Sequence, residues 1–296
     1  MQAEPRATER MPRWMRRPVR CGPELSMVEQ VLAEERLNTV CVGARCPNRG
    51  ECYSSGTATF MILGARCTRD CGFCAVPTGG TEAIDPEEPE RVARAAAAMG
   101  LRHVVVTSVT RDDLADGGSR QFVATVAAIR GALPGATVEV LVPDFAGREE
   151  DIDRVIEGRP DVFNHNVETV RRLYPEVRPQ AGYERSLGVQ VRSAAAGLAT
   201  KSGFMVGLGE TDEEVAGLLE DLTSAGCGLL TIGQYLRPAE SNLAVERYWE
   251  PAEFEALEAE ALALGFEAVA SGPLVRSSYF AHEMFDAAGV GGAGAK

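Results

Sequence analysis

The stretch CTRDCGFC at residues 67–74 is followed by a chain in which strand-like and helix-like patterns alternate. Residues 104–107 form a buried β run, and residues 121–133 carry apolar side chains at helical spacing. Strands separated by helices of this length are typical of parallel βα units, and about six such units form an open or partial α/β barrel. We therefore predict an α/β fold, a partial (β/α)6 TIM-like barrel with N-terminal and C-terminal extensions. The other strand-like runs lie at residues 138–142, 162–164, 203–207, 229–232 and 268–270.

The predicted barrel covers residues 59–270. It lies between an N-terminal extension of residues 1–58 and a C-terminal segment of residues 271–296. Inside the barrel, the pattern also predicts a helix over residues 167–174. Ligand sites in such folds gather at the C-terminal ends of the strands, so the residues that follow each strand are the first candidates for a site.

The charge of the chain limits its partners. Its 296 residues include 30 Lys and Arg against 43 Asp and Glu, for a net charge of −13. This balance argues against nonspecific binding to nucleic acid or to an anionic membrane. No run of 18 or more apolar residues is present, and the N-terminus has no apolar h-region, so we expect a cytoplasmic protein. The basic stretch RWMRRPVR at residues 13–20 is either a solvated arm or a docking surface for an acidic partner.

Six of the eight cysteines fall between residues 41 and 74. The cytosol keeps thiols reduced, so this cluster is better interpreted as a set of metal ligands than as a disulfide framework. A structural zinc site takes four ligands, with short Cys-x-x-Cys pairs, and only one such pair occurs here. The cysteines form two triplets, Cys41-x4-Cys46-x5-Cys52 and Cys67-x3-Cys71-x2-Cys74.

Two sets of three thiols suit two [4Fe–4S] clusters. Such a cluster has four irons that each need a ligand, so three cysteines leave one iron open to another group. An open position on a metal is where chemistry can take place. The Cys-x3-Cys-x2-Cys spacing followed by a barrel is typical of radical S-adenosylmethionine (SAM) enzymes, in which the open iron chelates the amino and carboxylate groups of SAM.

Polar residues and glycines that follow the strands are candidates for contacts with a bound cofactor. Asn and Glu are good partners for a ribose and an ammonium group. A glycine after a strand lets the backbone approach a ligand closely, although no Rossmann fingerprint is present. The candidates are Ser108, Asn164, Asn166, Glu168, Gly207, Gly209 and Tyr235.

From about residue 12 to residue 281, the chain resembles the lipoyl synthases. The Cys-x3-Cys-x2-Cys triplet is common to the whole superfamily, whereas the Cys-x4-Cys-x5-Cys triplet and the ending RSSY at residues 276–279 point to this branch. Phe280, where many relatives carry His, and Tyr53, where Trp is common, are small departures. The matching segments are CVGARCPNRGEC, GTATFMILG, CTRDCGFCAV, VVVTSVTRDDLADGG, FNHNVETVRRLY, TKSGFMVGLGET, GQYLRPAESNL, RYWEPAEF and SGPLVRSSY.

The resemblance implies a role for each triplet. Cys67, Cys71 and Cys74 would hold the cluster that cleaves SAM to methionine and a deoxyadenosyl radical. The other triplet would hold an auxiliary cluster that is consumed as the sulfur donor. Its fourth ligand would be a serine of the RSSY ending, and of Ser277 and Ser278 we favour Ser278. The auxiliary ligands are thus Cys41, Cys46, Cys52 and Ser278.

The resemblance also implies the reaction and the partners. Two sulfur atoms would be inserted into an octanoyl chain attached to a lysine of a lipoyl carrier domain, either the E2 component of a 2-oxoacid dehydrogenase or the H protein of glycine cleavage. An electron donor such as ferredoxin or flavodoxin and an iron–sulfur carrier would be further partners. The cofactor is needed because no side chain can abstract hydrogen from an aliphatic carbon.

Two other hypotheses remain open. One is a different radical SAM enzyme, such as a biotin-synthase-like sulfur inserter or a methylthiotransferase, which predicts another auxiliary ligand pattern. The other is a nonenzymatic zinc or iron–sulfur scaffold, which predicts a closed metal site and no cleavage of SAM. The RSSY ending argues against the first, and the polar loops after the strands argue against the second.

Overall fold

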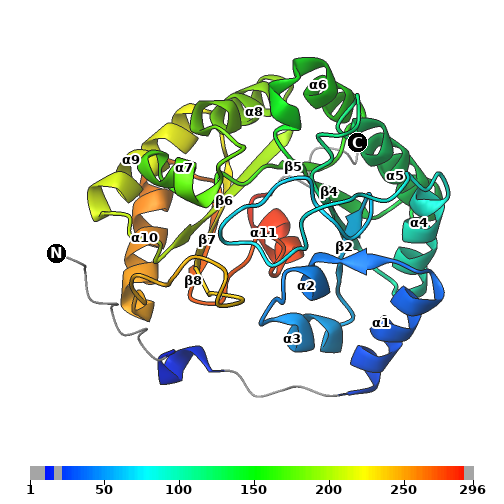
Figure 1. The fold of residues 1–296 in the computed structure, drawn as a ribbon, viewed down its shortest axis with the longest axis horizontal. Helices are drawn as coiled ribbons and strands as arrows, with labels where there is room; N and C mark the ends of the chain where they lie inside the picture. Colours follow the sequence, from blue (N-terminus) through cyan, green and yellow to red (C-terminus); the bar gives the residue numbers. More distant parts are fainter. Residues whose placement is uncertain (1–10, 17–21, 290–296) are drawn as a thin grey trace.

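A single sheet of eight strands frames the molecule in the computed structural model, which describes residues 11–16 and 22–289. The strands follow one another in chain order, from β1 (Asn38–Thr39) to β8 (Ala268–Gly272). β1 pairs antiparallel with β2, and every later pairing is parallel. The sheet curves into a ring that stays open between β1 and β8 (Figure 1).

Six βα units build the ring, which confirms the predicted partial barrel. Each strand from β2 to β7 is followed by a helix on the outside of the ring (Figure 1). The units are β2 (Thr59–Ile62) with α4 (Glu88–Ala98), β3 (His103–Ser108) with α5 (Ser119–Ala132), β4 (Thr137–Leu141) with α6 (Glu149–Glu157), β5 (Val162–Asn164) with α7 (Tyr174–Val177) and α8 (Tyr183–Ala195), β6 (Ala199–Val206) with α9 (Asp212–Ser224), and β7 (Leu229–Gln234) with α10 (Pro251–Leu264).

The remaining helices belong to the two ends of the chain and to connections. No helix in the described ranges is long and apolar enough to cross a membrane. Residues 1–10, 17–21 and 290–296 of the predicted extensions lie outside the described residues, and they include residues 17–20 of the basic stretch. The elements are η1 (Arg13–Met15), α1 (Pro23–Glu34), α2 (Val40–Gly43), α3 (Arg49–Ser54), η2 (Phe145–Gly147), η3 (Arg171–Leu173) and α11 (Ala281–Ala287).

The helix predicted over residues 167–174 is wrong in its first half. Glu168 instead forms a parallel bridge with Phe204 of β6, donating its amide to the carbonyl of Gly203 at 3.0 Å. Its backbone has a φ of 69°, a left-handed conformation that is uncommon outside glycine. The chain is therefore held against β6 at this strand end in a non-helical conformation, and the next helical turn, η3, begins only at Arg171.

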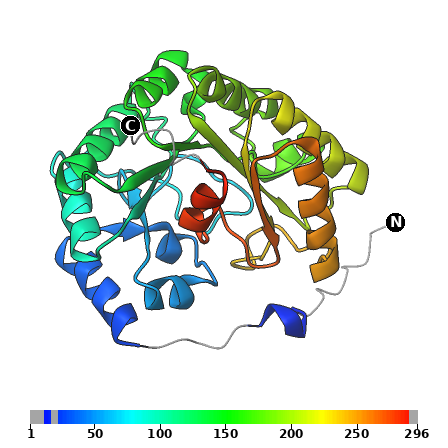
Figure 2. The ribbon, with the colours of Figure 1, turned by 180° about the vertical axis from the view of Figure 1, so that it is seen from behind.

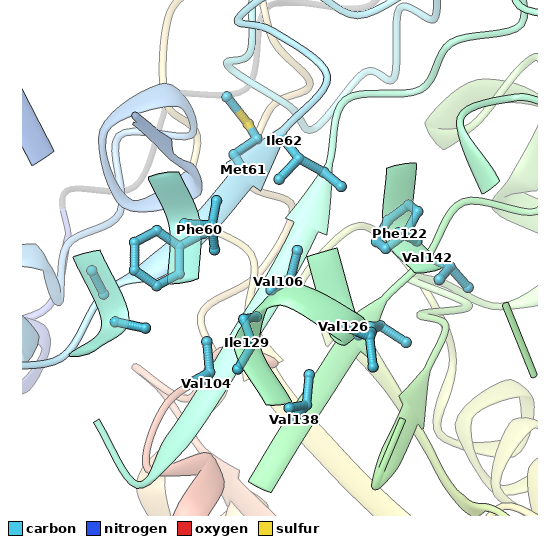
Figure 3. Packing of buried hydrophobic residues seen from close by; sticks show 14 of the residues in the cluster. Phe60, Met61, Ile62, Val104, Val106, Phe122, Val126, Ile129, Val138 and Val142 are labelled. Atoms are coloured by element: carbon cyan, nitrogen blue, oxygen red, sulfur yellow. The ribbon is translucent and has the colours of Figure 1, made fainter. Parts of the chain in front are cut away.

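Apolar side chains fill the space between the sheet and the outer helices. Phe60 of β2 and Val104 and Val106 of β3 are fully buried, and they lie in one cluster with Phe122 and Ile129 of α5 (Figure 3). Each such side chain contributes roughly 1.5–3 kcal/mol when it leaves water. This layer fixes the positions of the strands and hence of the loops at their ends.

The interior of the ring holds a buried ion pair. Lys201 of β6 lies 2.9 Å from the carboxylate of Glu139 of β4, and each side chain is only 1% exposed. The same carboxylate is contacted by His103 at 3.2 Å and accepts a hydrogen bond from Asn164 at 3.0 Å. Burial alone would raise the pKa of Glu139, but Lys201 and His103 hold it below its ordinary value. Glu139 is therefore ionised.

Helix α11 lies inside the ring and closes it beneath this pair. Both opposite views place the helix within the circle of strands (Figures 1 and 2). The ring of Phe285 meets the ring of His103 edge-on, with centroids 5.9 Å apart. Met284 and Phe285 are buried with Val162 and Leu229, so the C-terminal helix plugs one end of the barrel and leaves the other end for a site.

Replacing Lys201 with Met will destabilise the fold because it leaves the Glu139 carboxylate buried without its cation. We expect a loss of about 3–5 kcal/mol in the free energy of unfolding, measured by urea denaturation of the metal-free protein. The double variant Lys201→Met/Glu139→Gln should regain most of this loss. Since the pKa of Glu139 is lowered from its ordinary value of 4.5, the contribution of the pair is present above that pH and is lost as the pH falls below it. A single variant as stable as the parent would contradict this account.

Candidate active site

A cavity of about 550 Å³ opens at the C-terminal ends of the strands, and all six clustered cysteines line it. Ser108 ends β3, Asn166 follows β5, and Tyr235 follows β7, so the wall is built from several strand ends at once. All seven cysteines in the described residues are free thiols. The cavity thus brings the two cysteine triplets, which are separate in sequence, to one place.

Backbone hydrogen bonds hold the loop of Cys67, Cys71 and Cys74 over the barrel. The amide of Cys67 donates to the carbonyl of Pro77 at 2.9 Å, and the amide of Gly72 donates to the carbonyl of Val177 at 3.0 Å. On the far side, the side-chain amide of Asn242 donates to the carbonyl of Cys74 at 2.9 Å. The loop is therefore closed on itself by the first of these bonds and attached to two separate parts of the barrel rim by the other two.

Gly72 is required by this close approach. A Cβ atom at this position would lie 2.9 Å from the side chain of Leu243 and 3.2 Å from the carbonyl oxygen of Glu176. Leu243 itself donates its amide to the carbonyl of Gly72 at 3.0 Å. Any side chain at position 72 would push the cysteine loop away from the rim.

The strongest attachment of the loop is the side chain of Arg69. Its guanidinium makes two hydrogen bonds to Asp112, at 2.7 and 2.9 Å, and lies 2.7 Å from Asp144. Arg69 is 5% exposed and Asp144 is fully buried. Asp144 also pairs with Arg185 of α8 at 3.1 Å. Since Asp112 follows β3 and Asp144 follows β4, one arginine binds the loop to two strand ends.

Burial dominates the chemistry of the thiols before a metal is bound. It raises the pKa of Cys71, and it raises the pKa of Cys74 to about 12. In the other triplet, it raises the pKa of Cys41 to about 11 and that of Cys52 to about 12. Thiolates are the form that binds a metal, so occupation of either site releases protons.

The triplet of Cys41, Cys46 and Cys52 lies in and between two short helices beside the open edge of the ring. Cys41 lies in α2 and Cys52 in α3, with Cys46 in the loop between them. Thr39 caps α2 by accepting a hydrogen bond from the amide of Val42 at 3.4 Å. The side chain of Asn48 donates to the carbonyl of Leu274 at 2.6 Å, which ties this segment to the C-terminal part of the chain.

The RSSY segment, residues 276–279, lines the same cavity as the two triplets. Ser277 accepts a hydrogen bond from the side chain of Asn166 at 2.5 Å, on the barrel side. Ser278 accepts one from Thr59 at 2.7 Å, and Tyr279 donates to Glu51 in α3 at 3.1 Å. The two serines therefore face different partners. Ser277 faces Asn166 after β5, and Ser278 faces Thr59 at the start of β2, which also hydrogen-bonds with Cys41.

The donor set fits iron–sulfur clusters. Each triplet supplies three thiols to the same cavity, and the hydroxyl of Ser278 lies on the wall that they share. Among residues 11–16 and 22–289, no group of three or more His, Cys, Asp or Glu side chains is arranged to hold a single metal ion. Ligands of one zinc ion would share a centre about 2.3 Å from each sulfur, whereas the thiolates of a cluster bind different irons.

Four of the seven candidate cofactor residues line the cavity, namely Ser108, Asn166, Glu168 and Tyr235. The Ser108 hydroxyl and the Asn166 carbonyl oxygen are buried there without a hydrogen-bond partner in the described structure. A buried polar atom without a partner is costly, so these atoms are suited to a bound group. The Tyr235 hydroxyl instead donates to the carbonyl of Leu243 at 2.8 Å.

The structure places the other three candidates away from the cavity wall. Asn164 points to the ion pair in the barrel interior, where it donates to Glu139. Gly207 is needed for packing, because a Cβ there would collide with the side chain of Gln234 and the carbonyl of Arg247. A Cβ at Gly209 would make only an ordinary van der Waals contact with Glu246, at 3.4 Å, but the φ of 102° at this position favours glycine. Contact of these three residues with a cofactor stays a prediction from the sequence.

Two cavity residues were missed by the sequence analysis. Arg178 follows α7, and Arg276 begins the RSSY segment. Neither forms an ion pair with a carboxylate of the described residues, and the only hydrogen bond of the Arg276 guanidinium is to the carbonyl of Val275, at 2.6 Å. No local pattern distinguishes Arg178 from the other arginines, because its place beside the cysteine loop results from the fold.

Comparison with known proteins agrees with this fold. The model of the radical SAM superfamily matches residues 61–222. Among solved structures, HydG, a maturase of the [FeFe]-hydrogenase, superposes with a TM-score of 0.56 at 17% identity, over 71% of this chain and 50% of that chain. The chain is therefore a member of the radical SAM superfamily.

Full-length relatives define the branch. The lipoyl synthase of Rubrobacter xylanophilus is 54% identical over 287 residues, which cover 96% of this chain and 89% of that protein. The lipoyl synthase of Chlorobium phaeovibrioides is 54% identical over 274 residues, which cover 92% and 96%. The chain belongs to the lipoyl synthase family, and the resemblance seen in its sequence is confirmed.

Replacing Arg69 with Met will weaken the attachment of the cysteine loop, because Asp144 is then buried with less positive charge beside it. We expect the metal-free protein to lose about 3–5 kcal/mol of unfolding free energy in urea denaturation. The matched control is Arg66→Met in the same segment, since Arg66 is exposed and should change stability by less than about 0.5 kcal/mol. Equal effects of the two substitutions would show that Arg69 does not hold the loop.

Proposed function

We propose that this chain inserts two sulfur atoms into an octanoyl chain carried on a lysine of a lipoyl carrier domain, which forms the lipoyl cofactor. The observation that carries the proposal is that both cysteine triplets and the RSSY segment line one cavity. A site that must generate a radical and deliver sulfur to the same carbon needs both groups within reach of one substrate. Membership in the lipoyl synthase family supports the same reaction.

The proposed cofactors are two [4Fe–4S] clusters and SAM. Cys67, Cys71 and Cys74 hold the first cluster and leave one iron for SAM. When bound, these groups supply a deoxyadenosyl radical that takes hydrogen from unreactive carbons, and the auxiliary cluster supplies sulfur. The auxiliary ligands are Cys41, Cys46, Cys52 and Ser278.

Ser278 is the better candidate than Ser277 for the auxiliary ligand. Thr59 donates to Ser278, and hydrogen bonds from Thr59 also lower the pKa of the Cys41 thiol against the effect of burial. Thr59 thus contacts both groups. Ser277 is engaged by Asn166, on the side of the barrel.

Polar groups in the barrel mouth position SAM. The unpartnered Ser108 hydroxyl and Asn166 carbonyl oxygen are free to hydrogen-bond with its ribose or amino group. Glu168 lies beside them and accepts a hydrogen bond from Asn166 at 3.1 Å. Tyr235 contributes a wall of the same cavity.

The apolar part of the cavity suits the substrate chain. Val105 of β3, Leu141 of β4 and Val275 line it alongside the cysteines. An octanoyl chain gains about 0.8 kcal/mol for each methylene that it buries. The same apolar wall keeps water from a reactive intermediate, which prevents side reactions.

The macromolecular partners follow from the reaction. The substrate is an octanoylated carrier domain, such as the E2 component of a 2-oxoacid dehydrogenase or the glycine cleavage H protein. A ferredoxin or flavodoxin supplies electrons, and an iron–sulfur carrier rebuilds the consumed cluster. We further propose that an acidic carrier domain docks on residues 13–20 and that the protein is cytoplasmic. The division of the chain into residues 1–58, 59–270 and 271–296 is also part of the proposal.

Replacing single cysteines will separate the two clusters. Cys71→Ala should abolish cleavage of SAM to deoxyadenosine, because the first cluster loses a ligand. Cys46→Ala should leave measurable cleavage but stop sulfur insertion. Both products are measured by liquid chromatography and mass spectrometry after anaerobic reconstitution. Retained cleavage in Cys71→Ala, or lipoyl product from Cys46→Ala, would refute the corresponding assignment.

The two serines provide a matched pair of variants. Ser278→Ala should impair sulfur insertion at least tenfold, since removal of a group with a direct role in the reaction typically costs this much or more. Ser277→Ala should affect the product less. A defect confined to Ser277→Ala would move the auxiliary ligand by one residue.

A further inference from the structure

The side chain of Arg178 is buried beside the loop that carries Cys71. The hydrogen bond from the amide of Gly72 to the carbonyl of Val177, at 3.0 Å, brings the two segments together one residue away from each side chain. Arg178 is 9% exposed, and its side chain and that of Cys71 line the same cavity. A guanidinium is charged at every pH at which the protein is folded.

Among the residues that the structure describes, only neutral groups hydrogen-bond with this guanidinium. Nη1 donates to the carbonyl of Asn166 at 2.8 Å and to the hydroxyl of Tyr174 at 3.1 Å. Nε is buried without a hydrogen-bond partner in the described structure. No carboxylate in the described ranges forms an ion pair with it, and Asp144 pairs with Arg69 and Arg185 instead.

The charge of Arg178 therefore has no ion-pair partner among the described residues. Glu168 lines the same cavity without forming an ion pair with it, and burial raises the pKa of Glu168. An unpaired charge in the interior is costly unless an anion faces it. Arg178 and Cys71 line the same cavity, and their neighbours Val177 and Gly72 are joined by a backbone hydrogen bond. The positive charge thus acts on the place where the first cluster is held.

We propose that Arg178 sets the reduction potential of the cluster held by Cys67, Cys71 and Cys74, by stabilising the negative charge that the cluster gains on reduction. The inference rests on the proposed function for the identity of these ligands. The step concerned is the transfer of one electron from an external low-potential donor to the oxidised cluster, with no bond made or broken. Net charge is one of the factors that set the potential of such clusters.

The test measures the potential directly rather than the activity. The full-length chain with Cys41, Cys46 and Cys52 all replaced by Ala serves as the parent, so that only one cluster is present. After anaerobic reconstitution with iron and sulfide, the reduced cluster is followed by electron paramagnetic resonance during titration with dithionite, without SAM. The variants in this parent are Arg178→Met, Arg178→Gln and Arg178→Lys.

Arg172→Met is the matched control. Arg172 lies in η3, six positions before Arg178 in the chain, but its side chain is 55% exposed and pairs with Glu214 at 2.7 Å. Its removal takes one positive charge from the same segment without exposing a buried site. The reduction potential of the cluster in Arg172→Met should stay close to that of the parent.

Loss of the charge at position 178 should lower the equilibrium constant for reduction of the cluster at least about tenfold. This corresponds to a reduction potential lower by about 59 mV for a one-electron couple. Arg178→Lys should stay close to the parent. If Arg178→Met does not retain iron, Arg178→Gln gives the same comparison with a polar side chain. Equal shifts for the Lys and uncharged variants, or no shift in either uncharged variant, would overturn the inference. A parent chain that binds no iron would instead overturn the ligand assignment and the inference with it.

Discussion

Arg69 lies buried between Asp112 and Asp144, and this ion cluster fixes the cysteine loop to the ends of two strands. None of the three cysteines of that loop belongs to a strand or helix. Without the arginine, the loop would still keep the hydrogen bonds of its backbone, of the Thr68 hydroxyl and of Asn242, but none of these carries a charge. A cluster that must present one iron to a substrate needs a loop held in one place, and the barrel provides that through a charged contact.

The two ends of the barrel differ, because one is filled and the other is open to the site. Helix α11 and the pair of Lys201 and Glu139 fill one end, so that only the C-terminal ends of the strands remain open. The auxiliary triplet reaches this end from outside the ring, through α2 and α3, and the RSSY segment joins it from the other end of the chain. The two extensions are thus needed to complete one cavity.

The parts of this architecture that depend on local pattern were predictable. The cysteine spacings and most barrel strands are short-range signals, and they predicted the metal sites and the fold class. β2 was missed because its four residues are buried on both faces and show no alternation. The bridge of Glu168 to β6 and the roles of Arg69 and Arg178 depend on partners distant in the chain. Sequence also could not show that Asn164 donates to Glu139 in the barrel interior, or that Gly207 packs against Gln234 and Arg247.

The central claim is that one chain holds two four-iron clusters that act on one octanoyl substrate. The most direct measurement combines an iron count after anaerobic reconstitution with mass spectrometry of an octanoyl-lysyl peptide incubated with SAM and a reductant. The account predicts about eight irons per chain, as two such clusters require, together with sulfur added to the peptide. About four irons with deoxyadenosine but no added sulfur would keep the superfamily chemistry and contradict the claim, and zinc in place of iron would contradict both.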